Sequence, residues 1–251
     1  MKTLTLGGCR IPVSLDVTEN LTAIKQAIDW AHSNGVSIIS TPECALSGYM
    51  WRPHNGQDPR LLQLQSAEKA VADYSLAKGV DLVLGTAGFN DQGEWANMQL
   101  FIIDGQTQRR YAKQLLCGPE IGCYAPGQEL TVIDYKGFKI TGLICNDLWS
   151  NPLLWPGDSA FLMQELKSQQ VDVVFVSAYL PHAAQEQALF NVWNDTCIRM
   201  YSLTGCWVTV TSDRTIDGAE GLGPVGIVDK QGTWQVRGSD FATDYFKHTV
   251  S

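Results

Sequence analysis

The sequence of 251 residues lacks the features of several large classes of protein. No apolar run approaches the roughly 18 residues that a membrane-spanning helix needs. The N-terminus has no basic segment followed by an apolar stretch, so we expect no secretory signal. No block of Lys and Arg offsets the net charge of -8, which argues against a nucleic-acid partner. These absences argue against three classes of protein, but they identify no substrate.

The seven cysteines are an odd number in a chain too long to need disulfide staples. We therefore expect a reducing, cytoplasmic setting rather than a disulfide framework. Cys117 and Cys123 raise the alternative of a redox or metal-binding pair, but their spacing is not that of a CxxC motif. Ordinary buried thiols are the simpler interpretation, and we expect no metal ion or other cofactor.

A linker rich in Pro or Ser is also missing, so we expect residues 1–251 to form a single domain. The chain instead alternates strand-like apolar runs with segments of helical periodicity, an order typical of α/β proteins. Single strands are expected from Leu4 and at 36–39, 80–85, 171–177, 206–211 and 225–229. Hairpins are expected at 98–113 and 131–145. Helices are expected at 21–34, at 58–78, from Asp158 or Ser159, and at 183–203. Two sheets, each covered on its outer face by helices, would satisfy this pattern.

Cys145 is the most informative single residue, because it ends the apolar run 138–144, which is typical of a buried strand. A thiol at the C-terminal tip of a strand lies where open α/β sheets place their ligands. Two other strand-like segments end on ionisable residues, Glu43 and Lys113. Such a thiol, carboxylate and ammonium could supply a nucleophile, a base and a positive charge. Each also has a simpler interpretation when taken alone: Cys145 as a small buried residue, Glu43 as a helix cap, and Lys113 as an exposed residue at the end of a strand.

The same segments resemble the signatures of the carbon–nitrogen hydrolase, or nitrilase, superfamily. The matching segments are Pro42-Glu43, 111–116 and 142–149, with Glu120 and then 124–127 at the family's usual distance after Lys113. The resemblance extends from the strand at Leu4 to the turn at Gly232. It implies an α/β fold, a four-layer α-β-β-α sandwich of the nitrilase type. It also implies a homodimer, or a higher homo-oligomer, that pairs helix faces into an eight-layer stack.

The resemblance also implies a role for each of these residues. Glu43 would act as general base and acid, Lys113 would stabilise the oxyanion, and Cys145 would be the nucleophile that forms a thioester. Glu120 would orient the lysine or the substrate, the alternative being a solvated loop carboxylate. The backbone N–H of Asn146 would help to bind the oxyanion.

Aromatic residues near these segments are candidates for the walls of a substrate pocket. Trp149 is expected either in the acyl pocket or in the core. Tyr49, Trp51 and Trp155 are expected in loops at the mouth of the site. His182 is expected to be a surface residue rather than part of the pocket.

Two segments depart from the family's pattern. Residues 199–203 read Arg-Met-Tyr-Ser-Leu where the family has Arg-Ala-x-Glu-Asn, so the Glu and the Asn are absent. Residues 223–226 lack the serine of a later Gly-x-Ser element. The first departure puts the local contact between helix and strand in doubt more than the chemistry.

The residues after Cys145 favour one branch of the family. Asn146-Asp147-Leu148-Trp149 is closer to the Cys-Glu-Asp-x-Trp of the glutaminase domains attached to NAD synthetases than to the Trp-Glu that follows the cysteine of nitrilases. The length leaves no room for an ATP-pyrophosphatase domain, so we expect a stand-alone amidase that acts on a small amide or N-carbamoyl compound. The alternatives are a nitrile hydrolase, an acyltransferase that uses an amine acceptor, and a non-catalytic binding protein on the same scaffold.

Overall fold

The computed structural model describes residues 2–54, 56–150, 161–179, 187–214, 223–239 and 242–251. The first half contains β1 (Leu4–Pro12), α1 (Val17–Ser33), β2 (Ile38–Ser40), α2 (Pro59–Lys78), β3 (Asp81–Phe89), β4 (Trp95–Ile103), β5 (Gln106–Ala112) and the 3-10 turn η1 (Gly118–Glu120). The second half contains β6 (Val132–Tyr135), β7 (Phe138–Ile144), the 3-10 turn η2 (Cys145–Trp149), α3 (Phe161–Ser168), β8 (Val173–Ala178), α4 (Gln187–Ser202), β9 (Trp207–Arg214), β10 (Gly226–Val228), β11 (Trp234–Arg237) and β12 (Asp244–Val250).

Local sequence signals explain the ends of the first two helices. Asp16 caps α1, and its carboxylate accepts hydrogen bonds from the N–H groups of the first turn. Asp58 caps α2 in the same way, followed by a proline at the first helical position. Gly79 ends α2 with a φ of 63°, a left-handed conformation that glycine adopts without steric cost. The predicted start of a helix at Asp158 or Ser159 lies outside the described residues.

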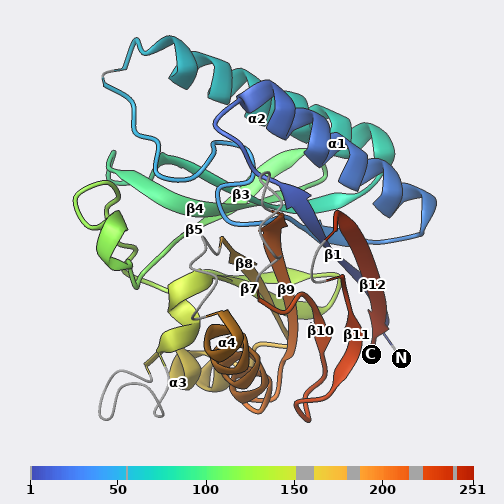
Figure 1. Cartoon of the computed structure of the whole chain (residues 1–251). Helices are drawn as coiled ribbons and strands as arrows, with labels where there is room; N and C mark the ends of the chain where they lie inside the picture. The colour runs from blue at the N-terminus through green and yellow to red at the C-terminus, as the bar shows by residue number, and fades with distance from the viewer. Residues whose placement is uncertain (1, 55, 151–160, 180–186, 215–222, 240–241) are drawn as a thin grey trace.

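The strands form two facing layers covered by helices, as Figure 1 shows. The hydrogen-bonded order is β5-β4-β3-β2-β1-β9-β8-β7-β6, with β12 beside β1 and β10 between β9 and β11. Strands β1 and β9 pair only through Arg10–Pro12 and Ser212–Arg214, so the two layers join at one end. Helices α1 and α2 cover the upper layer, and α3 and α4 cover the lower one (Figure 1). The predicted four-layer α-β-β-α sandwich is therefore confirmed.

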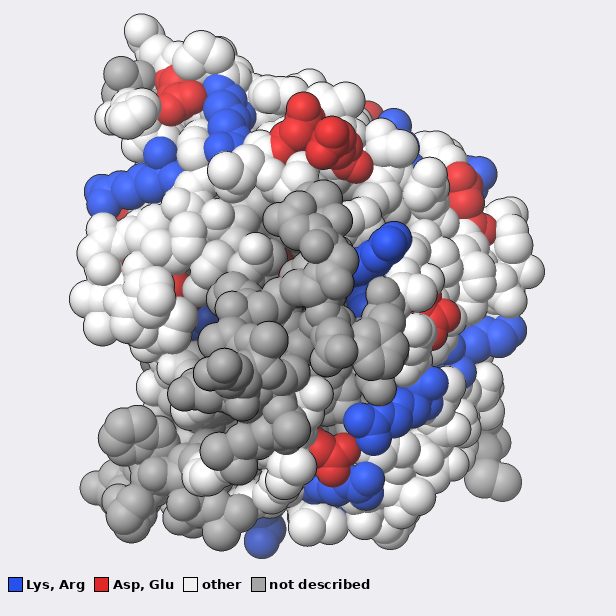
Figure 2. Space-filling view, in the orientation of Figure 1, with Lys and Arg blue, Asp and Glu red and all other residues white. Residues whose placement is uncertain are grey.

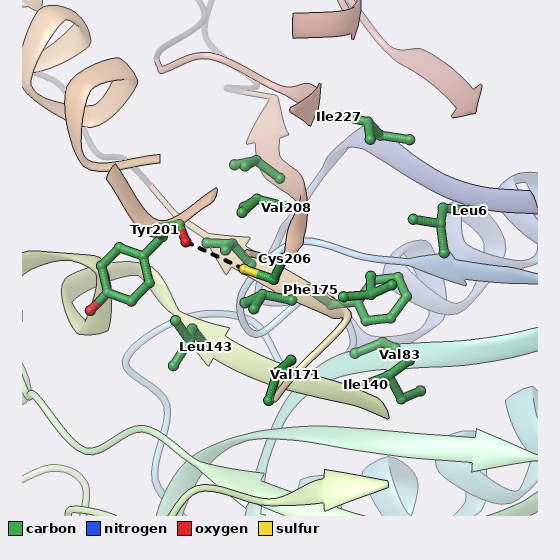
Figure 3. Packing of buried hydrophobic residues seen from close by; sticks show 14 of the residues in the cluster. Leu6, Val83, Ile140, Leu143, Val171, Phe175, Tyr201, Cys206, Val208 and Ile227 are labelled. Carbon is green, nitrogen blue, oxygen red and sulfur yellow. Dashed lines mark hydrogen bonds between the residues drawn. The ribbon is translucent and has the colours of Figure 1, made fainter. Parts of the chain in front are cut away.

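Apolar side chains from both layers fill the space between the sheets. Figure 3 shows Leu6 and Val83 of the upper layer close to Phe175 and Ile140 of the lower layer. A second cluster packs α1 and α2 against the outer face of the upper layer. This two-sided burial explains why the central strands read as nearly continuous apolar runs in the sequence.

Polar side chains also cross between the layers, close to the carboxyl ends of the strands. The Gln99 amide on β4 donates to the carbonyls of Leu143 and Phe175 and to the hydroxyl of Ser177, over 3.2, 3.1 and 2.7 Å. Ser177 in turn donates to the carbonyl of Thr41 over 2.7 Å. A Cβ at Gly142 would lie 1.8 Å from Oε1 of Gln99, so a larger residue there would displace the Gln99 amide. These contacts fix the end of β2 against β8.

Two strands follow the last one that the sequence predicts. The sequence predicts a final strand at 225–229, but β11 and β12 come after it in the structure. Strand β12 pairs antiparallel with β1, from Leu4 opposite Val250 to Arg10 opposite Asp244. Its side chains alternate irregularly between buried and exposed, and its partner lies at the other end of the chain, so no local pattern predicts it.

None of the helices in the described ranges is long and apolar enough to span a bilayer. On the visible, described part of the face in Figure 2, Lys and Arg lie among Asp and Glu rather than in one block.

Candidate active site

Glu43 lies in a tight turn that follows the end of β2. Its backbone N–H donates to the carbonyl of Ala178 at the end of β8, over 3.3 Å. The Glu43 residue is buried, with 1% exposed, and the residues that follow it form a turn rather than the helix that it was expected to cap. Oε1 accepts from Lys113 Nζ at 2.8 Å and from Asn97 Nδ2 at 2.7 Å, and Oε2 accepts from the N–H of Tyr179 at 2.8 Å. The turn therefore directs a carboxylate into the space between the two layers.

Lys113 links Glu43 to a second buried carboxylate. It follows β5, and its side chain is 1% exposed, so it is not a solvated strand end. Nζ lies 2.8 Å from Oε1 of Glu43 and 2.8 Å from Oε2 of Glu120. Glu120, in η1, is also fully buried and accepts a hydrogen bond from the N–H of Cys117 at 2.8 Å. The alternative of a solvated loop carboxylate for Glu120 is wrong.

Cys145 stands at the junction of β7 and η2 with a φ of 43°. This left-handed conformation is uncommon for a residue with a Cβ, and it costs roughly 1–2 kcal/mol. The side chain is half-buried, and the thiol donates to the carbonyl of Tyr179 over 3.8 Å. The strained turn thus presents the sulfur at the carboxyl ends of the strands, beside the backbone that also holds Glu43.

Burial and charge set the protonation of the three ionisable neighbours. Burial raises the pKa of Glu43 to about 7. The positive charge of Lys113 opposes this rise, and the negative charge of Glu120 adds to it. Burial would lower the pKa of Lys113, but the charges of Glu43, Cys145 and Glu120 raise it well above its usual value. Burial would raise the pKa of Glu120, but Lys113 and hydrogen bonds hold it below its usual value. The cluster therefore contains a fixed ammonium, a fixed carboxylate and a carboxyl that titrates near neutrality.

The thiol of Cys145 belongs to the same electrostatic cluster. Burial raises its pKa well above the usual value, the charge of Glu43 adds to the rise, and Lys113 opposes it. The sulfur is therefore protonated at neutral pH, and it needs a base before it can act as a nucleophile. Glu43 is the neighbour whose pKa of about 7 suits that task.

Sequence reasoning missed Asn97, which connects the two carboxylates. Its side-chain amide donates to Oε1 of Glu43 at 2.7 Å and to Oε1 of Glu120 at 3.0 Å. Its own Oδ1 accepts from the thiol of Cys44 at 3.5 Å. A polar residue within the apolar strand β4 was the available signal.

The predicted pocket residues lie in different surroundings. The Tyr49 ring stacks on Tyr179 with the centroids 4.5 Å apart, and its hydroxyl lies 3.4 Å from the sulfur of Cys117. The N–H of that Cys117 donates to Glu120, so Tyr49 lies one residue away from the carboxylate cluster, and burial and the charge of Glu43 raise its pKa. Trp149 is partly buried and packs against the hydrophobic cluster that includes residues of the lower layer and of α3 and α4. Asn146 is half-buried, and its N–H belongs to the first turn of η2, where such groups have no partner within the helix.

Trp51 packs edge-on against Trp95, at 5.3 Å between centroids, with the guanidinium of Arg60 4.4 Å from its ring. Trp155 and His182 lie outside the described residues. Cys117 and Cys123 are both free thiols. Among the described side chains, no three His, Cys, Asp or Glu residues are grouped as a metal site would require.

Comparison with known proteins gives one family over almost the whole chain. The model of the carbon-nitrogen hydrolase family matches residues 3–240. A glutamine-dependent NAD(+) synthetase of Synechocystis sp. is 26% identical over 150 residues, which are 55% of this chain and 26% of that protein. The chain therefore spans only part of that relative.

Solved structures share the fold at low sequence identity. An amidase from Nesterenkonia sp. superposes with a TM-score of 0.77 at 17% identity, over 98% of this chain and 90% of that one. A glutamine-dependent NAD+ synthetase from Acinetobacter baumannii gives a TM-score of 0.76 at 18% identity, over 100% of this chain and 46% of that one. A variant of the Nesterenkonia amidase superposes with a TM-score of 0.77 at 16% identity, over 98% of this chain and 90% of that one. That variant has the acetamide moiety of fluoroacetamide covalently added at its active-site cysteine.

Proposed function

The chain belongs to the carbon–nitrogen hydrolase family of enzymes acting on C–N bonds, and on this basis we propose that it hydrolyses a small amide through a thioester on Cys145. The observation that carries the proposal is the buried contact of Lys113 with both Glu43 and Glu120, beside a thiol held in a strained turn. This arrangement supplies a nucleophile, a base and a positive charge within one cluster.

The first step forms the tetrahedral intermediate. Glu43 accepts the thiol proton of Cys145 as the sulfur attacks the carbonyl carbon of the amide. The carbonyl oxygen becomes an oxyanion, which the ammonium of Lys113 and the N–H of Asn146 stabilise. Because Lys113 is held by two carboxylates, its charge is already in place when the oxyanion develops.

The second step releases the amine, and the third regenerates the thiol. The protonated Glu43 donates its proton to the amide nitrogen, the C–N bond breaks, and ammonia or an amine leaves a thioester on Cys145. A water molecule then gives a proton to Glu43 and attacks the thioester carbonyl. The acid product departs, and the sulfur recovers its proton from Glu43. A carboxyl with a pKa of about 7 suits both directions of this proton transfer.

A small amide or N-carbamoyl compound is the proposed substrate class. The likeness to an amidase supports an amide, and the relatives described as glutamine-dependent favour the side-chain amide of glutamine as a second candidate. A nitrile hydrolase and an amine-accepting acyltransferase would use the same residues as the amidase. In a non-catalytic binding protein these residues would catalyse no reaction.

A substrate panel with two readouts tests the proposal. Acetamide, glutamine, an N-carbamoyl amino acid and acetonitrile are each incubated with the protein, and released ammonia is measured with Cys145→Ala as the blank. Intact mass after short incubation reports an acyl adduct, and added hydroxylamine reports transfer to an amine acceptor. We expect ammonia from at least one amide and an adduct located on Cys145. Ammonia from the nitrile alone would favour a nitrilase, and neither ammonia nor adduct would favour the binding protein.

A further inference from the structure

Asp147 is a fully buried carboxylate two residues after the thiol of the site. Its Oδ1 accepts from the N–H groups of Gln114 at 3.1 Å and Leu115 at 2.8 Å. Its Oδ2 accepts from the N–H of Ile144 at 2.9 Å and from the hydroxyl of Tyr111 at 2.8 Å. One side chain therefore holds two segments that are distant in the sequence.

The donors lie directly beside the residues that the proposed chemistry uses. Gln114 and Leu115 follow Lys113, and Tyr111 precedes it by two positions. Ile144 immediately precedes Cys145. The Asp147 carboxylate therefore bonds the backbone after Lys113 to the backbone that carries Cys145.

Only a carboxylate satisfies this set of donors. Three of the four are main-chain N–H groups, which donate and cannot accept. Burial raises the pKa of Asp147, while hydrogen bonds from Leu115 and Ile144 oppose that rise and favour the ionised form. An amide at this position would direct its NH2 group at the N–H of Ile144 or at those of Gln114 and Leu115. A buried donor would then be left without an acceptor.

The opposite side of the same turn is also held. The hydroxyl of Tyr201 on α4 donates to the main-chain carbonyls of Asp147 at 2.7 Å and Ser150 at 2.9 Å. Tyr201 is fully buried, and it lies in the segment that departs from the family's pattern. The left-handed Cys145 is thus held by the Asp147 carboxylate on one side of η2 and by α4 on the other.

We propose that Asp147 is a positioning residue that sets the distance and direction between the ammonium of Lys113 and the sulfur of Cys145. The inference rests on the proposed function, because it assigns those two groups to one reaction. The hydrogen bonds of the Asp147 carboxylate go to three backbone N–H groups and to Tyr111, so it acts through the two backbone segments that it joins. A misplacement of about 1 Å at such a site costs on the order of a hundredfold in rate.

A second buried Tyr–Asp pair offers matched controls away from the site. At the amino end of β3, Asp81 accepts from the hydroxyl of Tyr135 at 2.7 Å and from the N–H of Asp104 at 2.9 Å. Asp147→Asn is compared with Asp81→Asn, and Tyr111→Phe with Tyr135→Phe. Each comparison makes the same substitution in a Tyr–Asp contact, and Asp81 also accepts from Lys136 at 3.4 Å. Only one of the two contacts borders the site.

Alkylation by iodoacetamide and steady-state kinetics give the readouts. We expect Asp147→Asn to lower both the rate of Cys145 alkylation and kcat by about 10- to 100-fold. KM should change far less than kcat. Tyr111→Phe, which removes one of the four donors and keeps the ring, should lower both rates by about 3- to 10-fold. The Asp81 and Tyr135 variants should melt at lower temperature but react at the parent's rate.

Parent-like alkylation and kcat in folded Asp147→Asn and Tyr111→Phe would overturn the proposal, as would losses no larger than those of the controls. If Asp147→Asn does not fold, Tyr111→Phe decides alone. Alkylation reports the position of the thiol even if the parent hydrolyses none of the amides tested. A failure of the proposed function is thereby distinguished from a failure of the positioning role.

Discussion

Cys44 and Cys145 each follow the carboxyl end of a strand, and each has a left-handed backbone, with φ of 51° and 43°. Their side chains differ in access. Cys44 is fully buried, and its thiol bonds to Oδ1 of Asn97, whereas Cys145 is half-buried near the carbonyl of Tyr179. Burial raises the pKa of both thiols.

The two turns deliver different residues to the same place. In the first, the bend after β2 directs Glu43 into the site and buries the cysteine that follows. In the second, the bend after β7 delivers the cysteine itself. Both cysteines therefore have a strained backbone, and the difference between them is that the Cys145 side chain is accessible whereas that of Cys44 is buried.

Replacing the two cysteines tests the comparison most strongly. Cys145→Ala should abolish turnover, since loss of a covalent nucleophile costs on the order of a thousandfold or more. Cys44→Ala removes an equally strained thiol but only two weak hydrogen bonds, to Asn97 at 3.5 Å and with the hydroxyl of Tyr124 at 3.8 Å, so turnover should stay within about fivefold of the parent. Ammonia release, with circular dichroism to verify folding, measures both. Similar losses in the two variants would remove the distinction between the turns.

Glu43→Gln tests what the first turn delivers. Glutamine keeps the size of the side chain but cannot accept the thiol proton, so turnover should fall by about 10²- to 10⁴-fold. Alkylation of Cys145 should slow in parallel, while substrate binding changes little. A Glu43→Gln protein that alkylates and turns over like the parent would reduce Glu43 to a structural role.

Lys113 connects the two turns through its charge. Lys113→Ala and Lys113→Arg should lower single-turnover acylation by about 10²- to 10³-fold, because the charge acts on the oxyanion in the transition state. Arginine should rescue little, since its planar fork does not replace a compact ammonium. Thermal unfolding must accompany the kinetics, because Lys113→Ala leaves two buried carboxylates unpaired. Acylation at the parent's rate in Lys113→Ala would show that backbone donors suffice.

The pH dependence gives the smallest and most specific effect. Below a pKa of about 7, Glu43 is protonated and cannot accept another proton, so alkylation of Cys145 should fall as the pH is lowered. The expected slope is about tenfold per pH unit on the acid side. Cys44 should stay unmodified throughout the range, as peptide mass mapping would verify. An alkylation rate without an acid limb near pH 7 would contradict the assignment of Glu43 as the base.

Much of the site could be predicted because its residues stand at the ends of recognisable elements. Apolar runs predicted β2 and β7, and the hairpins predicted at 98–113 and 131–145 are both present in the structure, as β4–β5 and β6–β7. Glu43, Lys113 and Cys145 follow these elements, and the structure brings them together with Glu120. Their roles, like the homodimer, the single domain and the cytoplasmic setting, stay predictions.

The missed features all depend on contacts between distant segments. Asn97 joins two carboxylates that come from other elements, and β12 pairs with the strand at the other end of the chain. Asp147 belonged to a matched signature, but its value lies in donors from the Lys113 segment. Periodicity and turn chemistry describe neighbours in sequence, so they carry no information about such partners.

The polar contacts between the two layers also bear on the order in which the chain folds. The bonds from Gln99 to Phe175 and from Ser177 to Thr41 join residues 76 and 136 positions apart. Contacts of such range form slowly, because a long loop must close before they contribute any stability. A refolding chain therefore regains its helices before it regains the environment of Cys145. Selective alkylation of that thiol should return with the slowest refolding phase, after the far-ultraviolet circular dichroism has recovered.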